Sequence, residues 1–169
     1  MELLTRKDVP EELTWDLTAL YKTEADIKSD VERVSALTDK IESEYKGKLN
    51  TPENILACLD LYREWQQILW FAASYRNLAA SVDYNDSKLQ EDDEAMSRLC
   101  ANLGSRLSFI DSEITAQPDS VIESAIAEGG PNCGYLKELL RWKPHQLEPE
   151  TEKVLAALSP TFGTPYNVY

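Results

Sequence analysis

The sequence is poor in the residues that most often hold metals. It has a single histidine, His145, and only three cysteines, Cys58, Cys100 and Cys133, among 169 residues. A zinc peptidase helix needs two histidines four positions apart with a glutamate between them, and no such H-E-x-x-H motif occurs. Nor does a glutamate precede His145 by three positions, as a di-iron bundle requires. We therefore predict no metal-binding, cofactor-binding or catalytic residue in this chain.

Basic side chains are also scarce, with 17 lysines and arginines against 30 acidic residues and a net charge of −13. A negative field repels phosphate backbones and anionic lipid surfaces, so we expect neither nucleic acid nor a membrane as partner. The charge is spread along the chain, for which solubility is the simpler explanation. Attraction of cationic peptides is the alternative.

Long apolar runs are missing. The longest, Ile68 to Ala73, is far shorter than the roughly 20 residues of a membrane-spanning helix. Charged residues interrupt Met1 to Leu13, which excludes the apolar core of a signal peptide there. The odd, widely spaced cysteines do not resemble a disulfide framework, so we predict a reducing, cytoplasmic location.

Alternating strand patterns are absent as well, and the pattern that is present predicts an all-α fold. Thr23 can cap an amphipathic helix whose first turn holds Glu24 and Asp26 and which ends near Gly47. Its apolar positions recur every three or four residues: Ile27, Val31, Val34, Leu37, Ile41 and Tyr45.

Thr51 followed by Pro52 predicts the start of a second helix, which runs to Val82 and is about 45 Å long. Its main apolar stripe comprises Ile55, Leu59, Tyr62, Trp65, Leu69, Ala72, Tyr75, Ala79 and Val82. A second stripe comprises Leu61, Ile68, Phe71 and Leu78. Two stripes indicate contact with two or more neighbouring elements.

A third long helix is predicted from Asp86 to Gln117, after a tight connection at Ser81 to Asp86. Such a short link predicts a long antiparallel helical hairpin within a bundle. We expect the two helices to meet near their middles through Leu69, Ala72, Leu103 and Leu107.

Shorter helical patterns follow Pro118, at Asp119 to Glu128, Tyr135 to Trp142 and about Pro149 to Leu158. We divide the chain into an extended segment (1–22), a helical domain (23–158) and an irregular segment (159–169). The last segment ends on Tyr166 to Tyr169, as if another element followed it.

Three features could carry chemistry, and each has a structural explanation that we favour. The acidic run Glu91 to Glu94 fits a solvated first turn, because consecutive residues point in different directions around a helix. The aromatic group Trp65, Trp70, Phe71 and Tyr75 fits core packing, with a ligand role as the alternative. His145 follows a helix-breaking proline and fits a histidine that caps or bonds backbone.

Three stretches resemble oligoendopeptidase F, a bacterial member of the thimet-like zinc metallopeptidases. The first is Val9 to Tyr21, in which a proline and then Trp15-Asp16-Leu17 lead into a helix. The second runs from the Asp83 to Asp86 turn to Ser112-Glu113-Ile114. The third and most specific, Leu140 to Ala156, is similar to the family's K-P-H-x-L segment and the helix after it.

The resemblance implies a cytoplasmic, zinc-dependent enzyme that hydrolyses short peptides, with this chain as its helical N-terminal part. That part would shape the substrate channel, whereas the H-E-x-x-H helix would lie in a C-terminal catalytic domain missing here. The chain alone is therefore expected to be inactive, and no catalytic residue is carried over to it. The alternative is a stand-alone helical module that binds a partner helix. Uncovered apolar surface also predicts a homodimer of the chain.

Overall fold

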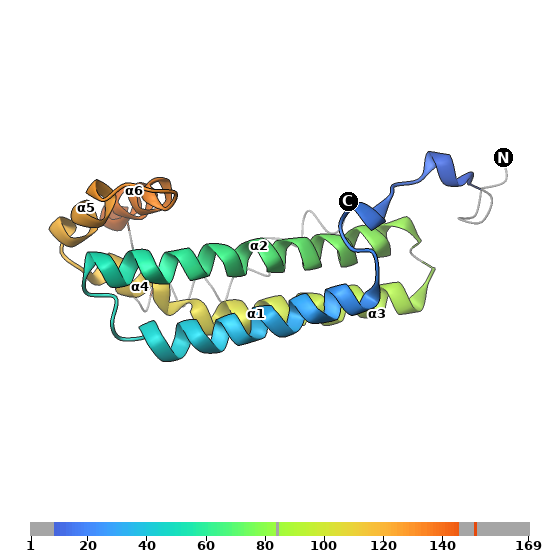
Figure 1. Cartoon of the computed structure of the whole chain (residues 1–169), viewed down its shortest axis with the longest axis horizontal. Helices are drawn as coiled ribbons and strands as arrows, with labels where there is room; N and C mark the ends of the chain where they lie inside the picture. The colour runs from blue at the N-terminus through green and yellow to red at the C-terminus, as the bar shows by residue number, and fades with distance from the viewer. Residues whose placement is uncertain (1–8, 84, 146–150, 152–169) are drawn as a thin grey trace.

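The computed structural model describes residues 9–83, 85–145 and 151, and its described part is all-α with no strand. Three long helices, α1 (Glu24–Tyr45), α2 (Pro52–Val82) and α3 (Ser87–Leu107), lie side by side with alternating directions (Figure 1). Three shorter helices follow: α4 (Phe109–Ala116), α5 (Asp119–Ala127) and α6 (Cys133–Trp142). The predicted helical hairpin is confirmed, and α1 completes a three-helix bundle with it.

The beginnings of the first two helices lie where the sequence predicts them. Thr23 and Asp26 cap each other's backbone, with distances of 3.2 Å to the Thr23 hydroxyl and 3.0 Å to the Asp26 carboxylate. The Thr51 hydroxyl accepts the Asn54 N–H at 3.3 Å, and Pro52 is the first residue of α2. These side chains satisfy N–H groups that have no partner within the helix itself.

The helix predicted from Asp86 to Gln117 is wrong as one unbroken element, because the structure divides it at Ser108 into α3 and α4. There the Ser108 N–H and hydroxyl both donate to the Ser105 carbonyl, at 3.4 and 2.8 Å. Serine side chains bond nearby backbone and so compete with the regular helical ladder. The helix predicted near Pro149 to Leu158 lies almost wholly outside the described residues.

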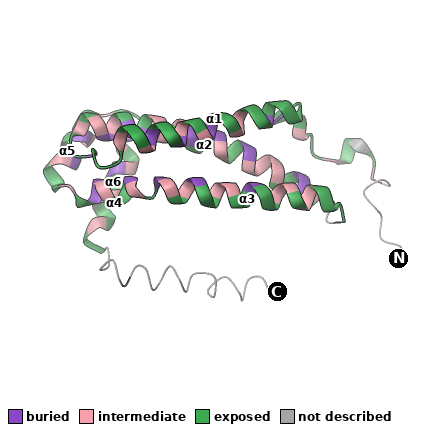
Figure 2. Cartoon of the chain, turned by 90° about the horizontal axis from the view of Figure 1, so that it is seen from below, coloured by how far each residue is buried: buried purple, intermediate pink, exposed green. Residues whose placement is uncertain are grey.

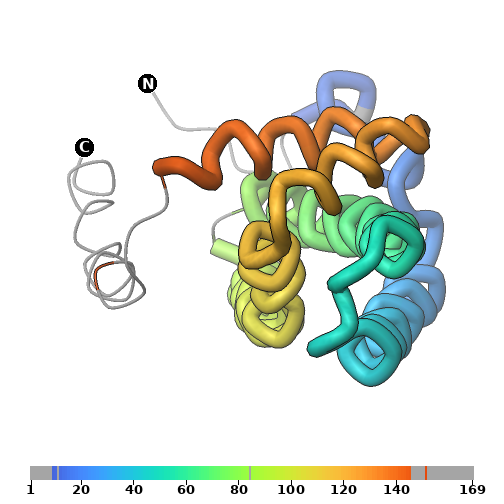
Figure 3. The backbone as a smooth tube through the Cα atoms, turned by 90° about the vertical axis from the view of Figure 1, so that its left-hand side faces the viewer, coloured from blue at the N-terminus to red at the C-terminus, as the bar shows by residue number. Residues whose placement is uncertain are grey.

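Of the shorter helices, α4 follows α3, and α5 and α6 lie across the end of the bundle where α2 begins (Figures 1 and 3). At the α4 end the Gly47 N–H donates to both oxygens of Glu113, at 2.8 and 2.9 Å. The Lys143 ammonium donates to the Gln117 carbonyl at 2.5 Å and to Asp119 at 2.6 Å. Glu113 and Lys143 both belong to stretches that resemble the family, and both hold helix ends together.

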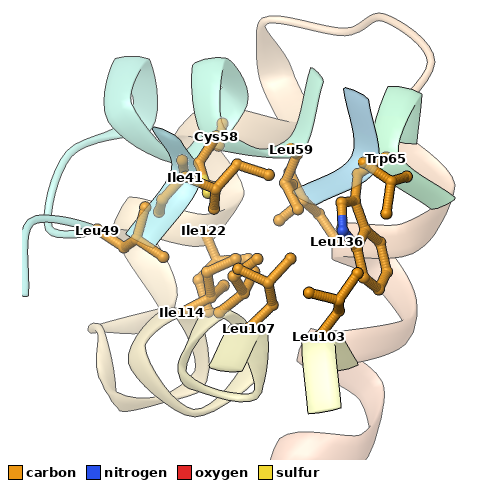
Figure 4. Packing of buried hydrophobic residues seen from close by; sticks show 14 of the residues in the cluster. Ile41, Leu49, Cys58, Leu59, Trp65, Leu103, Leu107, Ile114, Ile122 and Leu136 are labelled. Atoms are coloured by element: carbon orange, nitrogen blue, oxygen red, sulfur yellow. The ribbon is translucent and has the colours of Figure 1, made fainter. Parts of the chain in front are cut away.

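Buried residues lie on the facing sides of the helices (Figure 2), and they form two clusters. The larger cluster joins α1, α2, α3, α4, α5 and α6 and includes Leu103 and Leu107 (Figure 4). The smaller one contains Tyr21, Ile27, Ala72 and Met96. The expected pairing is confirmed for Leu69, which packs against the cluster that holds Leu103 and Leu107. It is wrong for Ala72, which lies with Met96 in the smaller cluster.

Arg76 on α2 connects the other two long helices. It bonds Glu24 of α1 at 2.6 and 3.0 Å and Asp92 of α3 at 3.4 Å, and its side chain is 14% exposed. We expect Arg76→Gln to lower the free energy of unfolding by about 1 to 2 kcal/mol, between the values for exposed pairs and for buried bonds to charged groups. Urea unfolding measures this loss.

Arg98 provides the control for Arg76, because its pair with Glu94 at 3.4 Å is exposed and lies within a single helix. Arg98→Gln should cost no more than about 0.5 kcal/mol. Equal losses for the two variants would show that the bridge through Arg76 adds nothing to stability.

Candidate functional site

The four clustered aromatic residues of α2 occupy one buried, one half-buried and two exposed positions. Trp65 is 5% exposed, lies flat on Tyr62 at 5.4 Å between ring centroids, and donates its indole N–H to the Thr38 hydroxyl at 2.8 Å. Tyr75 is half-buried and meets Tyr21 edge to face at 5.6 Å. Core packing is thus confirmed for these two residues.

Trp70 and Phe71 point away from the core, with 74% and 43% of their surface exposed. Core packing as an explanation of Trp70 is therefore wrong. The reason is the geometry of the bundle: Trp70 borders α3 and Phe71 borders α1, and within the described residues neither helix covers these side chains. Leu13, Trp15 and Leu78 are further exposed large apolar residues on the described chain, and they line one hollow of about 360 Å³.

A groove of about 500 Å³ runs beside Trp70 between α2 and α3. Because these helices are antiparallel, the Trp70 end lies near Cys100 and the Asn77 end near Asp93. The same register places the Gln90 amide 2.9 Å from the Ala80 carbonyl. The lining residues are Trp70, Ala73, Ser74, Asn77, Asp93, Met96, Ser97 and Cys100.

The acidic run at the start of α3 does not converge on one point. Asp92 turns toward Arg76 and Lys88, and Glu94 pairs with Arg98. The predicted solvated first turn is wrong, because the first turn of α3 contains no acidic residue and Asp92 and Asp93 are half-buried. Asp93 is different, because it lines the groove and forms no ion pair within the described part of the chain. Its carboxylate adds to the rise that burial causes in the pKa of the Cys100 thiol.

His145 lies in a short 3-10 turn (Lys143–His145) after α6 and is exposed. Its ring meets that of Trp142 edge to face at 6.1 Å between centroids. The predicted bond from this imidazole to backbone is not among the contacts of residues 9–83, 85–145 and 151. Those same residues contain no group of three or more histidine, cysteine, aspartate or glutamate side chains that could hold a metal. The described side chains therefore do not fit a zinc ion, and we derive no chemical step through one.

The three cysteines are free thiols. Cys58 is fully buried, and this burial raises the pKa of its thiol from 9.0 to about 12. Burial also raises the pKa of Tyr21 and of Tyr135, and each phenol donates a hydrogen bond to a carboxylate, Asp30 and Asp111 respectively. All three groups stay protonated in the folded chain at a pH where the unfolded chain releases its protons.

The chain should consequently lose stability as the pH rises above about 9, since the unfolded state then binds fewer protons than the folded state. Urea midpoints measured from pH 8 to pH 11 test this expectation. In Cys58→Ala the decline should be less steep, because one of the groups with a raised pKa is gone. A midpoint that rises over this range would contradict the assignment.

Sequence reasoning missed the Arg76 bridge and the groove. An arginine in an apolar stretch is a weak signal of an ion pair between helices, and nothing in the sequence pattern shows which two acidic residues it contacts.

None of the helices within residues 9–83 and 85–145 is long and apolar enough to cross a membrane.

Comparison with known proteins places these features in a wider context. The family model described as Oligopeptidase F matches residues 113–169. The plasmid-encoded oligoendopeptidase F of Lactococcus lactis subsp. cremoris is 25% identical over 168 residues, which is 97% of this chain and 28% of the relative. Group B oligopeptidase PepB of Streptococcus agalactiae serotype III (strain NEM316) is 22% identical over 161 residues, 94% of this chain and 27% of that protein.

The fold is shared with a solved structure. The crystal structure of a candidate peptidase from Chlamydophila abortus superposes with a TM-score of 0.74 at 20% identity, over 96% of this chain and 28% of that one. The chain thus spans about 28% of the length of the first curated relatives that it matches. In sequence, over nearly its whole length, the chain is similar to the N-terminal part of oligoendopeptidase F.

Proposed function

We propose that the chain is the N-terminal helical part of a cytoplasmic, zinc-dependent oligopeptidase that hydrolyses short peptides. In this proposal it shapes one side of the substrate channel and contributes no catalytic residue. The observation that carries it is similarity over 97% of the chain to about 28% of an oligoendopeptidase F. Three free thiols support the cytoplasmic location, because disulfides are rare in reducing compartments.

The test is to read the encoding frame past Tyr169 and to assay both its whole product and the 169-residue chain. The whole product should contain an H-E-x-x-H helix and cleave a short fluorogenic peptide in a chelator-sensitive way. The chain by itself should cleave nothing, with or without added zinc, and a chelator should leave its circular dichroism unchanged. Chelator-sensitive cleavage by the purified chain would overturn the assignment of chemistry to a following domain.

A stand-alone interaction module is the second candidate, and the exposed Trp70, Phe71 and Leu78 favour it. Apolar helix faces of this kind can receive an amphipathic partner helix. A homodimer through uncovered apolar surface stays a prediction. If the reading frame ended at Tyr169 and the chain stayed strictly monomeric in sedimentation runs at high concentration and high salt, this second candidate would replace the first.

A further inference from the structure

We propose that the groove between α2 and α3 binds an arginine side chain of a short peptide, with Asp93 as the partner of the guanidinium. This inference rests on the proposed function, because that function brings peptides to the chain. It adds a preference for cationic peptides and names the residues that would produce it.

The groove has a charged end and an aromatic end. Asn77 and Asp93 lie at one end and Trp70 at the other, and two helical turns between Trp70 and Asn77 make this distance about 10 Å. Asp93 is half-buried and has no cationic partner among the described residues, whereas Asp92 and Glu94 beside it are both paired. The unpaired carboxylate is the one that faces the groove.

The floor between these ends is apolar. Met96 is buried and Ala73 half-buried, and both line the groove with Cys100. An arginine covers apolar surface with its methylene stem and keeps its charged head hydrated or paired, so its length suits a floor that ends at a carboxylate. Its planar guanidinium also matches a carboxylate in a two-pronged bond, which the ammonium of lysine cannot form.

Trp70 can then hold the residue next to the arginine. An indole with 74% of its surface exposed offers a large, rigid contact for an apolar side chain. The net charge of −13 favours the approach of a cationic peptide over a long range, and the groove gives that attraction a defined end point.

The test follows the indole N–H resonances of the chain by NMR as acetyl-Leu-Arg-Leu-amide is added. Trp70→Phe assigns the Trp70 resonance. We expect a saturable shift at Trp70 and none at the buried Trp65. The same peptide with citrulline in place of arginine keeps the shape and loses the charge, and it should bind about tenfold more weakly.

Two matched variants separate the groove from the general field of the chain. Asp93→Asn and Glu91→Gln each remove one negative charge from the same turn, and Glu91 is exposed and does not line the groove. Asp93→Asn should weaken binding about tenfold, and Glu91→Gln less than about twofold. Ser97→Lys places a cation one turn from Asp93 within the groove and should abolish binding.

Several results would overturn the proposal. These are equal binding of the arginine and citrulline peptides, equal weakening by Asp93→Asn and Glu91→Gln, or shifts that spare Trp70. None of these results changes the outcome of the reading-frame test. The proposed arginine site can therefore be wrong while the proposed function is correct. Conversely, binding at the groove in a chain whose frame ends at Tyr169 would leave the site in place and remove the peptidase assignment.

Discussion

Replacing Trp65 with alanine should lower the free energy of unfolding by about 3 to 5 kcal/mol, the range for large aromatic residues removed from a core. The side chain is 5% exposed and belongs to the larger cluster (Figure 4). Its loss removes the stack on Tyr62 and leaves a cavity between α1 and α2. Thr38 is buried in α1, and its hydroxyl also loses the hydrogen bond that it accepts from the Trp65 indole N–H at 2.8 Å.

Trp70→Ala is the matched control, because it makes the same chemical change on the same helix at a side chain with 74% of its surface exposed. It should alter stability by no more than about 0.5 kcal/mol. Urea melts followed by circular dichroism compare the two variants under identical conditions. Similar losses at the two positions would mean that α2 is rotated relative to the arrangement described above.

Leu103→Ala should cost about 2 to 5 kcal/mol, the range for a buried leucine. Leu103 is 3% exposed and lies in the cluster that also holds Trp65 and Leu107. The large effect is expected because Leu103 and Leu107 are buried residues through which α3 packs against α2 and the short helices. Urea unfolding measures this loss. If the dependence of the unfolding free energy on urea concentration keeps the same slope in the variant, the change is assigned to the stability of the folded state.

Leu13 offers the corresponding control for Leu103, since it is 73% exposed and should tolerate alanine with a change within about 0.5 kcal/mol. If Leu103→Ala cost less than about 0.5 kcal/mol as well, Leu103 would lie at the surface. The antiparallel packing of α2 against α3 would then need a different register.

The helices were predictable where local chemistry decides them. Thr23 and Thr51 cap α1 and α2 with their own hydroxyls, and Pro52 fits the first turn without losing a useful donor. The division at Ser108 was not predictable, because serine tolerates both a helix and a turn. The choice there follows from packing, since Ile110 and Ile114 of α4 are buried in the larger cluster.

The groove could not be predicted for a related reason. Trp65 and Trp70 are five positions apart and therefore about 140° apart around α2. The apolar stripes include Trp65 and leave out Trp70, but they do not show which residues of α3 lie beside Trp70. Likewise, Asp93 differs from Asp92 and Glu94 only through the register of α3 against α2. Sequence patterns specify the helices well and their mutual register poorly.

The family-like stretches were recognisable, and the structure gives several of them a mechanical role. Asp86 accepts the Lys88 and Leu89 N–H groups and so caps α3, at 2.9 and 3.2 Å. Asp16 likewise accepts the Thr18 N–H, at 2.9 Å. Residues that cap or tie helix ends have few acceptable replacements, which explains how a motif can mark a fold without taking part in catalysis.

The unequal size of the two buried clusters has a consequence for local opening of the bundle. Among the described residues, the cluster near α4, α5 and α6 contains fifteen buried residues, whereas the cluster nearer the connection from α2 to α3 contains four. Free energies of local opening follow the apolar surface that the opening exposes. Backbone amides in the last turns of α2 and the first turns of α3 should thus exchange with deuterium sooner than those around Leu59 and Ile114. The groove spans the more easily opened end, so its walls can adjust to a ligand while the opposite end stays closed.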